Sequence, residues 1–304
     1  MYAAINGTKI YYDVDGAGAS VKDGEIKHKP VIFILHGGPG GSHLNFKPYL
    51  DELTKTAQLV YIDQRGCGYS DPDDPAMYTL DQNVEDVEML RQHLGVDQIW
   101  ILGHSYGGMV AMSYASRYQE HTAGLILAAT SPSYNFMEKA KQHVKEYGNA
   151  EQIAVADMLW EGTFKSEEQL QEYYRVMAPL YSTKTARTQS QQEAPANRPA
   201  VQRNFQALNK GFGEFLRRYD VREELKSLRI PTLIIAGRHD WITHYTESEE
   251  MHRLIPGSEL QIMEHSSHSL FADDTEGTNL LIIDFLTKHP ISSGYISKLI
   301  VSSK

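Results

Sequence analysis

The stretch that decides the fold is Gly103-His104-Ser105-Tyr106-Gly107-Gly108, which directly follows the apolar run at residues 99–102. A short apolar run is typical of a buried strand, and residues 109–118 are compatible with a helix. A Gly-x-Ser-x-Gly sequence between a strand and a helix predicts a nucleophile elbow, a turn so tight that only small residues fit two positions either side of the serine. Ser105 is therefore the candidate nucleophile, placed where free helix amides favour negative charge.

The same pattern also occurs in glycine-rich turns that carry no chemistry, because glycine and serine both favour turns. A catalytic role for Ser105 requires a base, an acid and an oxyanion hole elsewhere in the chain. Their presence in the right order would distinguish an elbow from an ordinary turn.

The composition is that of a globular protein. At 304 residues, of which 41% are hydrophobic, the chain is long enough for a large core and an added subdomain. The net charge of −10 argues against nucleic acid or anionic membranes as partners, since both need clustered Lys and Arg. The first residues lack a basic segment followed by an apolar one, so we expect no signal peptide, no membrane span and a cytoplasmic protein. The single cysteine, Cys67, cannot form an internal disulfide.

Short apolar runs alternate with helical patterns along most of the chain. Alternation around Asn6-Gly7 predicts a hairpin within residues 3–14. Residues 80–94 carry an apolar stripe at helical spacing, with Thr79 as N-cap and Gly95 as stop. Continuous apolar runs predict buried strands at 31–35, 59–62, 99–102, 125–129 and 232–236, with a weaker strand at 260–263. This order predicts an α/β fold with a mostly parallel sheet flanked by helices.

The strand signal stops between residues 131 and 225, where the sequence indicates several helices and a polar loop at 182–199. A helical insertion in an α/β core is most simply a cap over the active site. We therefore predict three segments: a first core part at 1–132, a helical cap at 133–225 and a second core part at 226–304. The last helix should run from 274 to about 289, where Pro290 ends it.

An acid and a base for Ser105 follow the last two predicted strands. Enzymes with a nucleophile elbow carry the triad in the order Ser, acid, His, each on a loop at the carboxyl edge of the sheet. Asp240 follows the strand at 232–236, and His268 follows the strand at 260–263. We therefore expect Asp240 to orient and stabilise the imidazole of His268, which takes the proton of Ser105.

Other histidines lie close to these positions. His239 adjoins the acid and His265 lies three residues before His268, so each is an alternative base. His268 is preferred because it lies deeper in the loop after the strand. His104 flanks the nucleophile and is expected to point away from it. His265 and His268 would also suit a metal, but no further ligands follow at zinc-like spacing, so we predict neither a metal nor a cofactor.

Two backbone amides are needed to stabilise the oxyanion, one from the residue after the nucleophile and one from the loop after an earlier strand. Tyr106 provides the first. Gly38, in the loop His36-Gly37-Gly38-Pro39-Gly40 after the strand at 31–35, is the predicted second donor, because glycine lets the backbone approach a substrate closely. A plain glycine turn is the alternative.

Three motifs together resemble the proline iminopeptidase family of α/β-hydrolases. They are the glycine loop at 36–40, the segment Asp63-Gln64-Arg65-Gly66-Cys67-Gly68-Tyr69-Ser70 and the elbow at 103–108. The resemblance covers most of the core and thins in the cap. It implies the α/β-hydrolase fold with an inserted helical cap, and the cleavage of N-terminal residues, preferably proline, from peptides.

The resemblance also implies acidic cap residues that hold the free amino group of the substrate. Glu161, in Trp160-Glu161-Gly162-Thr163, and Glu214, in Phe212-Gly213-Glu214-Phe215, are similar to segments that carry such glutamates in bacterial and archaeal members. The alternative is that both are solvated helix residues. Trp241 is a departure, because some relatives have an acid beside the triad aspartate where this chain has an aromatic residue, and it joins the candidate substrate-binding residues.

The sequence therefore predicts a serine hydrolase of the proline iminopeptidase type, with a short peptide or another small molecule as substrate. A carboxylesterase or lactonase is the close alternative, because the triad serves any acyl group and a fold does not fix the substrate. A non-catalytic ligand-binding protein is a third alternative, which an intact triad disfavours. The oligomeric state is left open.

Overall fold

An eight-stranded sheet is the centre of the computed structural model, which describes residues 1–188 and 202–290. The strands lie in the order β1-β2-β6-β5-β7-β8-β9-β10; β2 pairs antiparallel with β1 and with β6, and all the other pairs are parallel. The bounds of these strands are β1 (Tyr2–Ile5), β2 (Thr8–Asp15), β5 (Val31–Leu35), β6 (Gln58–Ile62), β7 (Ile99–His104), β8 (Thr122–Ala128), β9 (Thr232–Gly237) and β10 (Glu259–Met263). The predicted α/β fold with its N-terminal hairpin is confirmed.

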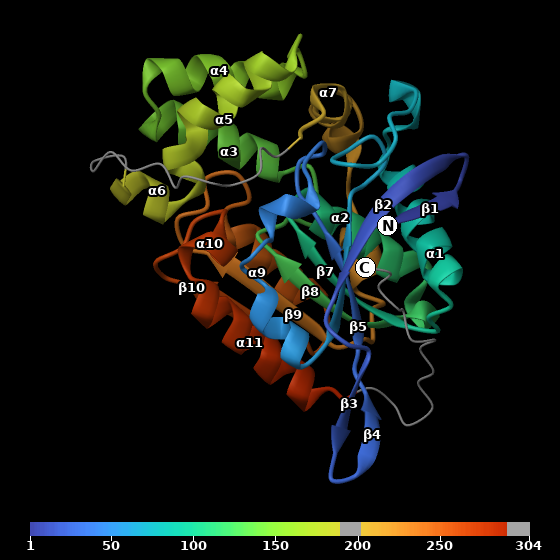
Figure 1. Cartoon of the computed structure of the whole chain (residues 1–304). Helices are drawn as coiled ribbons and strands as arrows, with labels where there is room; N and C mark the ends of the chain where they lie inside the picture. The colour runs from blue at the N-terminus through green and yellow to red at the C-terminus, as the bar shows by residue number, and fades with distance from the viewer. Residues whose placement is uncertain (189–201, 291–304) are drawn as a thin grey trace.

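Helices cover both faces of the sheet and one of its ends (Figure 1). The α-helices are α1 (Leu80–Leu94), α2 (Tyr106–Arg117), α3 (Phe136–Tyr147), α4 (Ala150–Glu161), α5 (Glu167–Tyr181), α6 (Thr183–Thr188), α7 (Phe205–Gly213), α8 (Arg222–Leu225), α9 (Tyr245–Leu254), α10 (Leu270–Asp273) and α11 (Thr275–Lys288). Short 3-10 helices are η1 (His43–Asn45), η2 (Asp51–Lys55), η3 (Pro75–Met77), η4 (Gln119–His121) and η6 (Phe215–Arg218). In the described part of the chain, none of the helices combines the length and the apolar character needed to cross a membrane.

Strand β5 shows why the predicted strands are apolar throughout. Val31 and Phe33 join one buried cluster with residues of α1 and α2, whereas Ile32 and Ile34 join a second cluster with residues of α11. Successive side chains of a strand point to opposite faces, so a strand that helices cover on both sides needs an apolar residue at every position.

The ends of α1 follow the sequence signals. Thr79 Oγ1 accepts a hydrogen bond from the backbone N–H of Gln82 at 3.2 Å, and Gly95 closes the helix with a left-handed φ of 66°. Helix α2 begins at Tyr106, three residues before the predicted start, because the turn at Ser105 leads directly into it. The predicted last helix agrees with α11.

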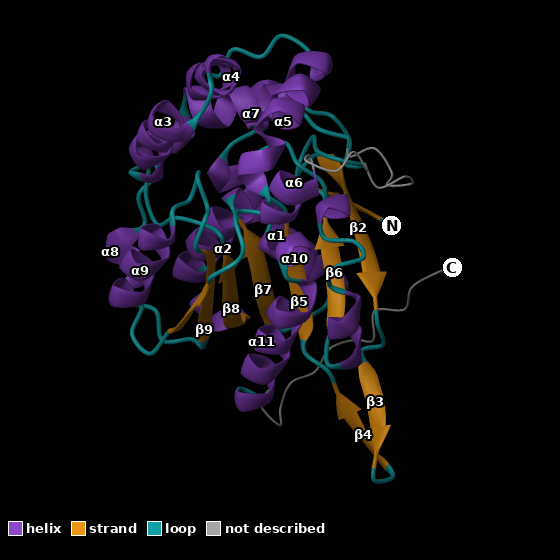
Figure 2. Cartoon of the chain, turned by 90° about the vertical axis from the view of Figure 1, so that its left-hand side faces the viewer, coloured by secondary structure: helices purple, strands orange, loops and turns teal. Residues whose placement is uncertain are grey.

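Helices α3 to α7, called here the cap helices, follow β8 in the sequence and gather over one end of the sheet (Figures 1 and 2). The predicted loop at 182–199 is wrong in its first part, where α6 forms. Ser182 Oγ accepts a hydrogen bond from Thr185 N at 3.2 Å and Asp273 Oδ1 accepts one from Lys184 N at 3.2 Å, so first-turn amides find partners. Residues 189–199 lie outside the described residues, and the segment boundaries at 132 and 225 stay predictions.

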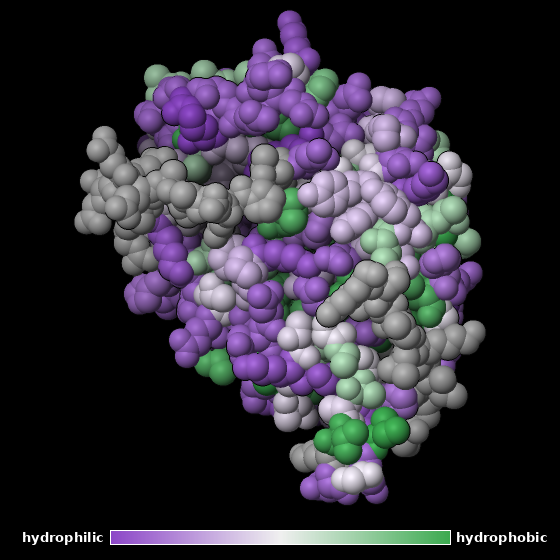
Figure 3. Space-filling model, in the orientation of Figure 1, coloured by the Kyte–Doolittle hydropathy of each residue, from purple (hydrophilic) through white to green (hydrophobic). Residues whose placement is uncertain are grey.

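A second hairpin, β3 (Ala19–Lys22) with β4 (Glu25–His28), was not predicted and projects from the end of the molecule opposite the cap helices (Figure 2). In this hairpin Val21 and Ile26 are 75% and 70% exposed to solvent. A hydrophobic patch is visible at this end of the molecule (Figure 3). The turn Asp23-Gly24, with φ of 54° and 79°, is the local signal that identifies such a hairpin.

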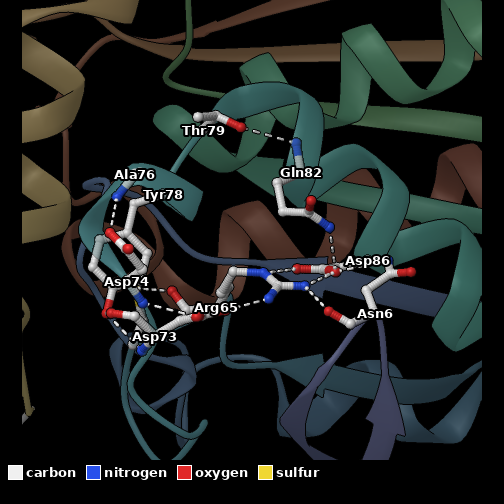
Figure 4. A network of polar contacts seen from close by, with 10 residues as sticks. Asn6, Arg65, Asp73, Asp74, Ala76, Tyr78, Thr79, Gln82 and Asp86 are labelled. Carbon is white, nitrogen blue, oxygen red and sulfur yellow. Dashed lines mark hydrogen bonds and ion pairs between the residues drawn. The ribbon is translucent and has the colours of Figure 1, made fainter.

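Arg65, in the loop after β6, connects three parts of the chain (Figure 4). Its side chain is 1% exposed. Nε and Nη2 donate to the carboxylate of Asp86 in α1 at 2.9 and 2.6 Å, Nη1 pairs with Asp73, and Nη2 also donates to the carbonyl of Asn6 at 3.1 Å. These contacts offset the cost of burying the guanidinium and tie the first hairpin, α1 and the loop after β6 together.

Asp63, at the start of that loop, also connects separate segments of the chain. Its carboxylate is fully buried and accepts hydrogen bonds from the backbone N–H of His43 at 2.7 Å and of Tyr69 at 2.8 Å, and it pairs with His43 Nδ1 at 2.9 Å. A Cβ on Gly68 would lie 2.2 Å from this carboxylate, so only glycine fits there. The segment 63–70 thus has a structural role, because its side chains and glycines fix the path of the loop after β6.

His36 fixes the glycine loop that follows β5. The ring is fully buried; Nδ1 donates to the carbonyl of Gly37 at 2.8 Å, and Nε2 accepts from the backbone N–H of Gln64 at 3.0 Å. A carbonyl oxygen only accepts, so the proton lies on Nδ1 and the ring is neutral. Burial is the main cause that lowers the pKa of His36. The loops after β5 and β6 are held together through this ring.

We expect Asp86→Ala to lower the free energy of unfolding by about 3 kcal/mol, because it leaves the buried charge of Arg65 short of one partner. Urea denaturation measures the change. Glu85→Ala is the matched control on the same helix, since Glu85 is 42% exposed and pairs with Arg117; it should cost about 1 kcal/mol or less. Equal losses in the two variants would contradict the role given to Arg65.

We also expect stability to fall as the pH is lowered from about 6.5 to about 5. The folded state keeps His36 neutral with a lowered pKa, whereas the unfolded chain protonates its histidines near pH 6.5. The unfolded state therefore binds more protons below that pH, and the stability that is fully present above it is lost towards the folded pKa, by up to about 1.4 kcal/mol per pH unit. Urea midpoints that do not change between about pH 6.5 and about pH 5 would contradict this expected loss of stability.

Candidate active site

Ser105 forms the turn between β7 and α2. Its backbone lies at φ 56° and ψ −124°, a conformation that costs a non-glycine residue about 1–3 kcal/mol and persists only where the surroundings impose it. A Cβ on Gly103 would lie 2.4 Å from the carbonyl oxygen of Gly107, and one on Gly107 would lie 2.1 Å from that of Leu35. Both positions therefore require glycine, as the elbow motif predicts.

The loops after β9 and β10 bring Asp240 and His268 into contact. Asp240 Oδ2 lies 2.8 Å from His268 Nδ1, and both side chains are buried. The carboxylate is held by the backbone N–H groups of Ile242 and Thr243 at 2.9 and 3.0 Å, and by the hydroxyl of Thr243 at 2.9 Å. An ionised carboxylate only accepts, so Nδ1 of His268 carries a proton and Nε2 is left as the acceptor of the neutral ring.

Opposing influences act on the acidity of Asp240. Burial, the largest of them, raises the pKa of the carboxyl, but the electrostatic interaction and hydrogen bond with His268 and the hydrogen bonds from Thr243 bring the pKa below its usual value. Asp240 is therefore ionised at neutral pH, as a residue that orients and stabilises an imidazolium must be.

Ser105 and His268 line one cavity of about 720 Å³, which lies between the carboxyl edge of the sheet and the cap helices. Ser105 belongs to the wall of this space, and its hydroxyl makes no hydrogen bond within residues 1–188 and 202–290. A wall of apolar and aromatic side chains, among them Phe46, Leu159 and Tyr181, surrounds it. The space is large enough for a short peptide or a ligand of similar size.

The alternative histidines occupy other places. His239 and His265 line a second cavity, of about 520 Å³, and not the cavity of Ser105. His104, predicted to point away from the nucleophile, instead lines the cavity of Ser105; that prediction is wrong because its Nε2 donates to the carbonyl of His268 at 2.9 Å. Desolvation and the nearby His268 lower the pKa of His104 to about 3. Among the described residues, no three His, Cys, Asp or Glu side chains are grouped to hold a metal ion.

The candidate oxyanion donors lie on both sides of Ser105. Gly38, at φ 124°, lines the cavity together with Gly37, and a Cβ on Gly37 would lie only 2.9 Å from Cβ of Ser105. Tyr106 is the first residue of α2, where a backbone N–H has no partner in the helix. Its side chain lies away from the cavity and accepts a hydrogen bond from Asn83 at 2.8 Å, so only its amide is available as an oxyanion donor.

The structure does not bring Glu161 and Glu214 to the cavity. The side chain of Glu161, at the end of α4, is 69% exposed and lies 3.7 Å from Arg217. That of Glu214, just after α7, is 54% exposed and pairs with Lys210 at 2.6 Å. Each helix buries its apolar face against the neighbouring helices and leaves these glutamates on the solvent side.

Trp241 does not line the cavity of Ser105. The side chain is 1% exposed, with its ring 6.1 Å from that of Trp160 and 5.3 Å from that of Tyr181. It lines the second cavity, as Asp240 does. Trp241 therefore belongs to the packing that supports the loop of Asp240.

The sequence analysis missed the charged residues that do line the cavity. They are Lys47, in the segment between η1 and η2, and Arg203, just before α7. Among the described residues, no aspartate or glutamate lines this cavity. A single arginine in an irregular segment has no periodicity or motif, so only the three-dimensional arrangement identifies it.

Comparisons with known proteins show the fold and the family of this chain. A family model described as the alpha/beta hydrolase fold matches residues 30–275. The proline iminopeptidase of Saccharolobus solfataricus is 31% identical over 94% of this chain and 91% of its own, and that of Lactobacillus helveticus is 31% identical over 88% of this chain and 92% of its own. An alpha/beta fold family hydrolase from Bacillus anthracis superposes with a TM-score of 0.75 at 22% identity, over 94% of this chain and 98% of its own. The chain therefore belongs to the proline iminopeptidase family of α/β-hydrolases.

Proposed function

We propose that this hydrolase releases N-terminal residues, preferably proline, from short peptides with a triad of Ser105, His268 and Asp240. The observation that carries the proposal is the constrained backbone of Ser105 at the wall of a cavity that His268 also lines. The family supplies the substrate class, since the relatives that match most of the chain are named proline iminopeptidases. A cytoplasmic location, expected from the composition, is part of this proposal.

In the first half of the reaction, Nε2 of His268 takes the proton of Ser105 while the serine oxygen attacks the carbonyl carbon of the first residue. The carbonyl oxygen becomes an oxyanion, which the amides of Tyr106 and Gly38 stabilise. Asp240 keeps the imidazolium oriented through Nδ1. The C–N bond then breaks, and the departing amine takes the proton from Nε2 of His268.

In the second half, water hydrolyses the acyl-enzyme. His268 takes a proton from the water as its oxygen attacks the ester carbonyl, and returns that proton to the oxygen of Ser105 as the acyl C–O bond breaks. The N-terminal residue leaves as a free amino acid. Ser105, His268 and Asp240 are then in their starting protonation states.

An esterase or lactonase activity is the second candidate, and one observation favours it. No carboxylate of the described residues lines the cavity, whereas an aminopeptidase needs a group that receives a protonated amine. Glu161 and Glu214, the residues expected in that role, point to solvent. A neutral ester has no such requirement.

The triad is tested by substitution. We expect Ser105→Ala and His268→Asn each to lower kcat by about 10⁴-fold or more, because each removes a group of one catalytic unit. His265→Asn is the matched control, since His265 lies three residues away and does not line the cavity. Circular dichroism checks that the variants are folded. Activity that survives in His268→Asn and disappears in His265→Asn would reassign the base.

The substrate class is tested on the unmodified protein with a panel of prolyl amides, other aminoacyl amides, simple esters and lactones. We expect kcat/KM for a free N-terminal proline to exceed that for other residues by at least about 10-fold, which corresponds to about 1.4 kcal/mol of transition-state binding. N-acetylation of the proline should abolish cleavage. Turnover of esters without any cleavage of amides would establish the second candidate instead.

A further inference from the structure

The charged side chains that line the cavity are all cationic among the described residues. Lys47 and Arg203 are the cationic ones among the described lining residues, and they differ in their partners. Lys47 Nζ is paired with Asp13 at 2.5 Å and with Asp15 at 2.9 Å, so its charge is already compensated. Arg203 makes no ion pair within the described part of the chain. The cavity thus contains one guanidinium whose charge is not offset by a carboxylate of those residues.

Arg203 is held in place by its neighbour in the sequence. The backbone N–H of Asn204 donates to the carbonyl of Gly40 at 2.9 Å, and its side-chain amide donates to that of Gly66 at 2.7 Å. A Cβ on Gly40 would lie 2.3 Å from the carbonyl oxygen of Asn204, so the two backbones are in direct contact. Arg203 is therefore anchored to the same glycine loop that provides Gly38 beside the nucleophile.

The guanidinium also lies against an aromatic wall that reaches the base. Its central carbon is 4.1 Å from the centre of the Tyr174 ring in α5. Tyr174 contacts Tyr181 with 5.8 Å between ring centres, and Tyr181 contacts His268 at 5.5 Å. The guanidinium also forms a hydrogen bond with the Tyr174 side chain. A guanidinium has five N–H donors, so the others remain for a carboxylate, which accepts from two of them side by side. All four side chains line the one cavity.

We propose that Arg203 binds a carboxylate of the substrate, so that the protein selects short peptides whose free C-terminal carboxylate lies in the leaving group. This inference rests on the proposed function, because in the release of an N-terminal proline the acyl part carries no second carboxyl group. The carboxylate then belongs to the amine that departs. Di- and tripeptides have that group within the cavity, whereas a peptide amide of the same length lacks it.

The test uses Ser105→Ala, in which peptides bind without being cleaved, and calorimetric titration with the dipeptide Pro-Ala and with its C-terminal amide. A charge-assisted hydrogen-bonded pair predicts that the free acid binds roughly 10- to 100-fold more tightly than the amide. In Ser105→Ala with Arg203→Gln, the ratio of the two dissociation constants should fall to about 1, and Arg203→Lys should retain part of it. Each ratio is internal to one variant and does not depend on its overall affinity.

Lys47→Gln in the same background is the matched control, because it removes the cation that is already paired; the acid-to-amide ratio should persist. A ratio near 1 in Ser105→Ala, a ratio unchanged by Arg203→Gln, a ratio lost only in Lys47→Gln, or no binding of either peptide would each overturn the inference. Release of proline from Pro-Ala by the unmodified protein is measured in parallel. Tight binding of the acid without cleavage would reject the proposed peptidase and leave the role of Arg203 standing, whereas cleavage without preference for the acid would do the reverse.

Discussion

The close approach of helix α2 to strand β5 is the constraint on which the site depends. Gly107 lies so near the carbonyl of Leu35 that no side chain fits between them, and Gly103 faces Gly107 across the same turn. The chain between the two glycines is forced into the strained backbone of Ser105. Because β5 ends at this point, the loop that follows it begins beside the nucleophile, and Gly37 contacts Ser105 directly. One packing contact therefore positions both Ser105, the proposed nucleophile, and the loop of the candidate oxyanion donors.

Several of the motif residues that identify the family do not line the cavity of Ser105. His36, Asp63 and Arg65 are buried below the carboxyl edge of the sheet and bind backbone or charged groups of other loops. None of the three lines the cavity of Ser105. These three side chains hold the loops after β5 and β6 in place beside the elbow. Such support is needed whatever substrate the enzyme acts on. A motif of this kind identifies a scaffold more securely than it identifies a substrate.

The core and its edge could be predicted from sequence, whereas of the cap only its helical character could be predicted, and not which side chains face the cavity. A strand buried on both faces is apolar at every position, so continuous runs of apolar residues predict β5, β7 and β9. Asp240 and His268 could then be chosen because the carboxyl ends of parallel strands meet at one edge. His104 was misjudged because the direction of a side chain within a tight turn depends on the loop of His268 that packs against it. Amphipathic helices, in contrast, show which face is apolar but not which helix will cover it. Glu161 and Glu214 therefore matched a motif and yet face solvent, while Arg203 matched none and lines the cavity.

The order of the parts along the chain has a consequence for protein synthesis. The strand and turn of Ser105 are complete within the first 117 residues, and the cap helices follow, but Asp240 and His268 belong to the loops after the last two strands of the sheet. A ribosome-bound chain that has emerged as far as the cap holds Ser105 without Asp240 and His268, the groups proposed to activate it. Under the proposed triad, hydrolytic competence arises late in translation, after the cap helices have been made, and a truncated product that ends before residue 268 lacks the proposed base.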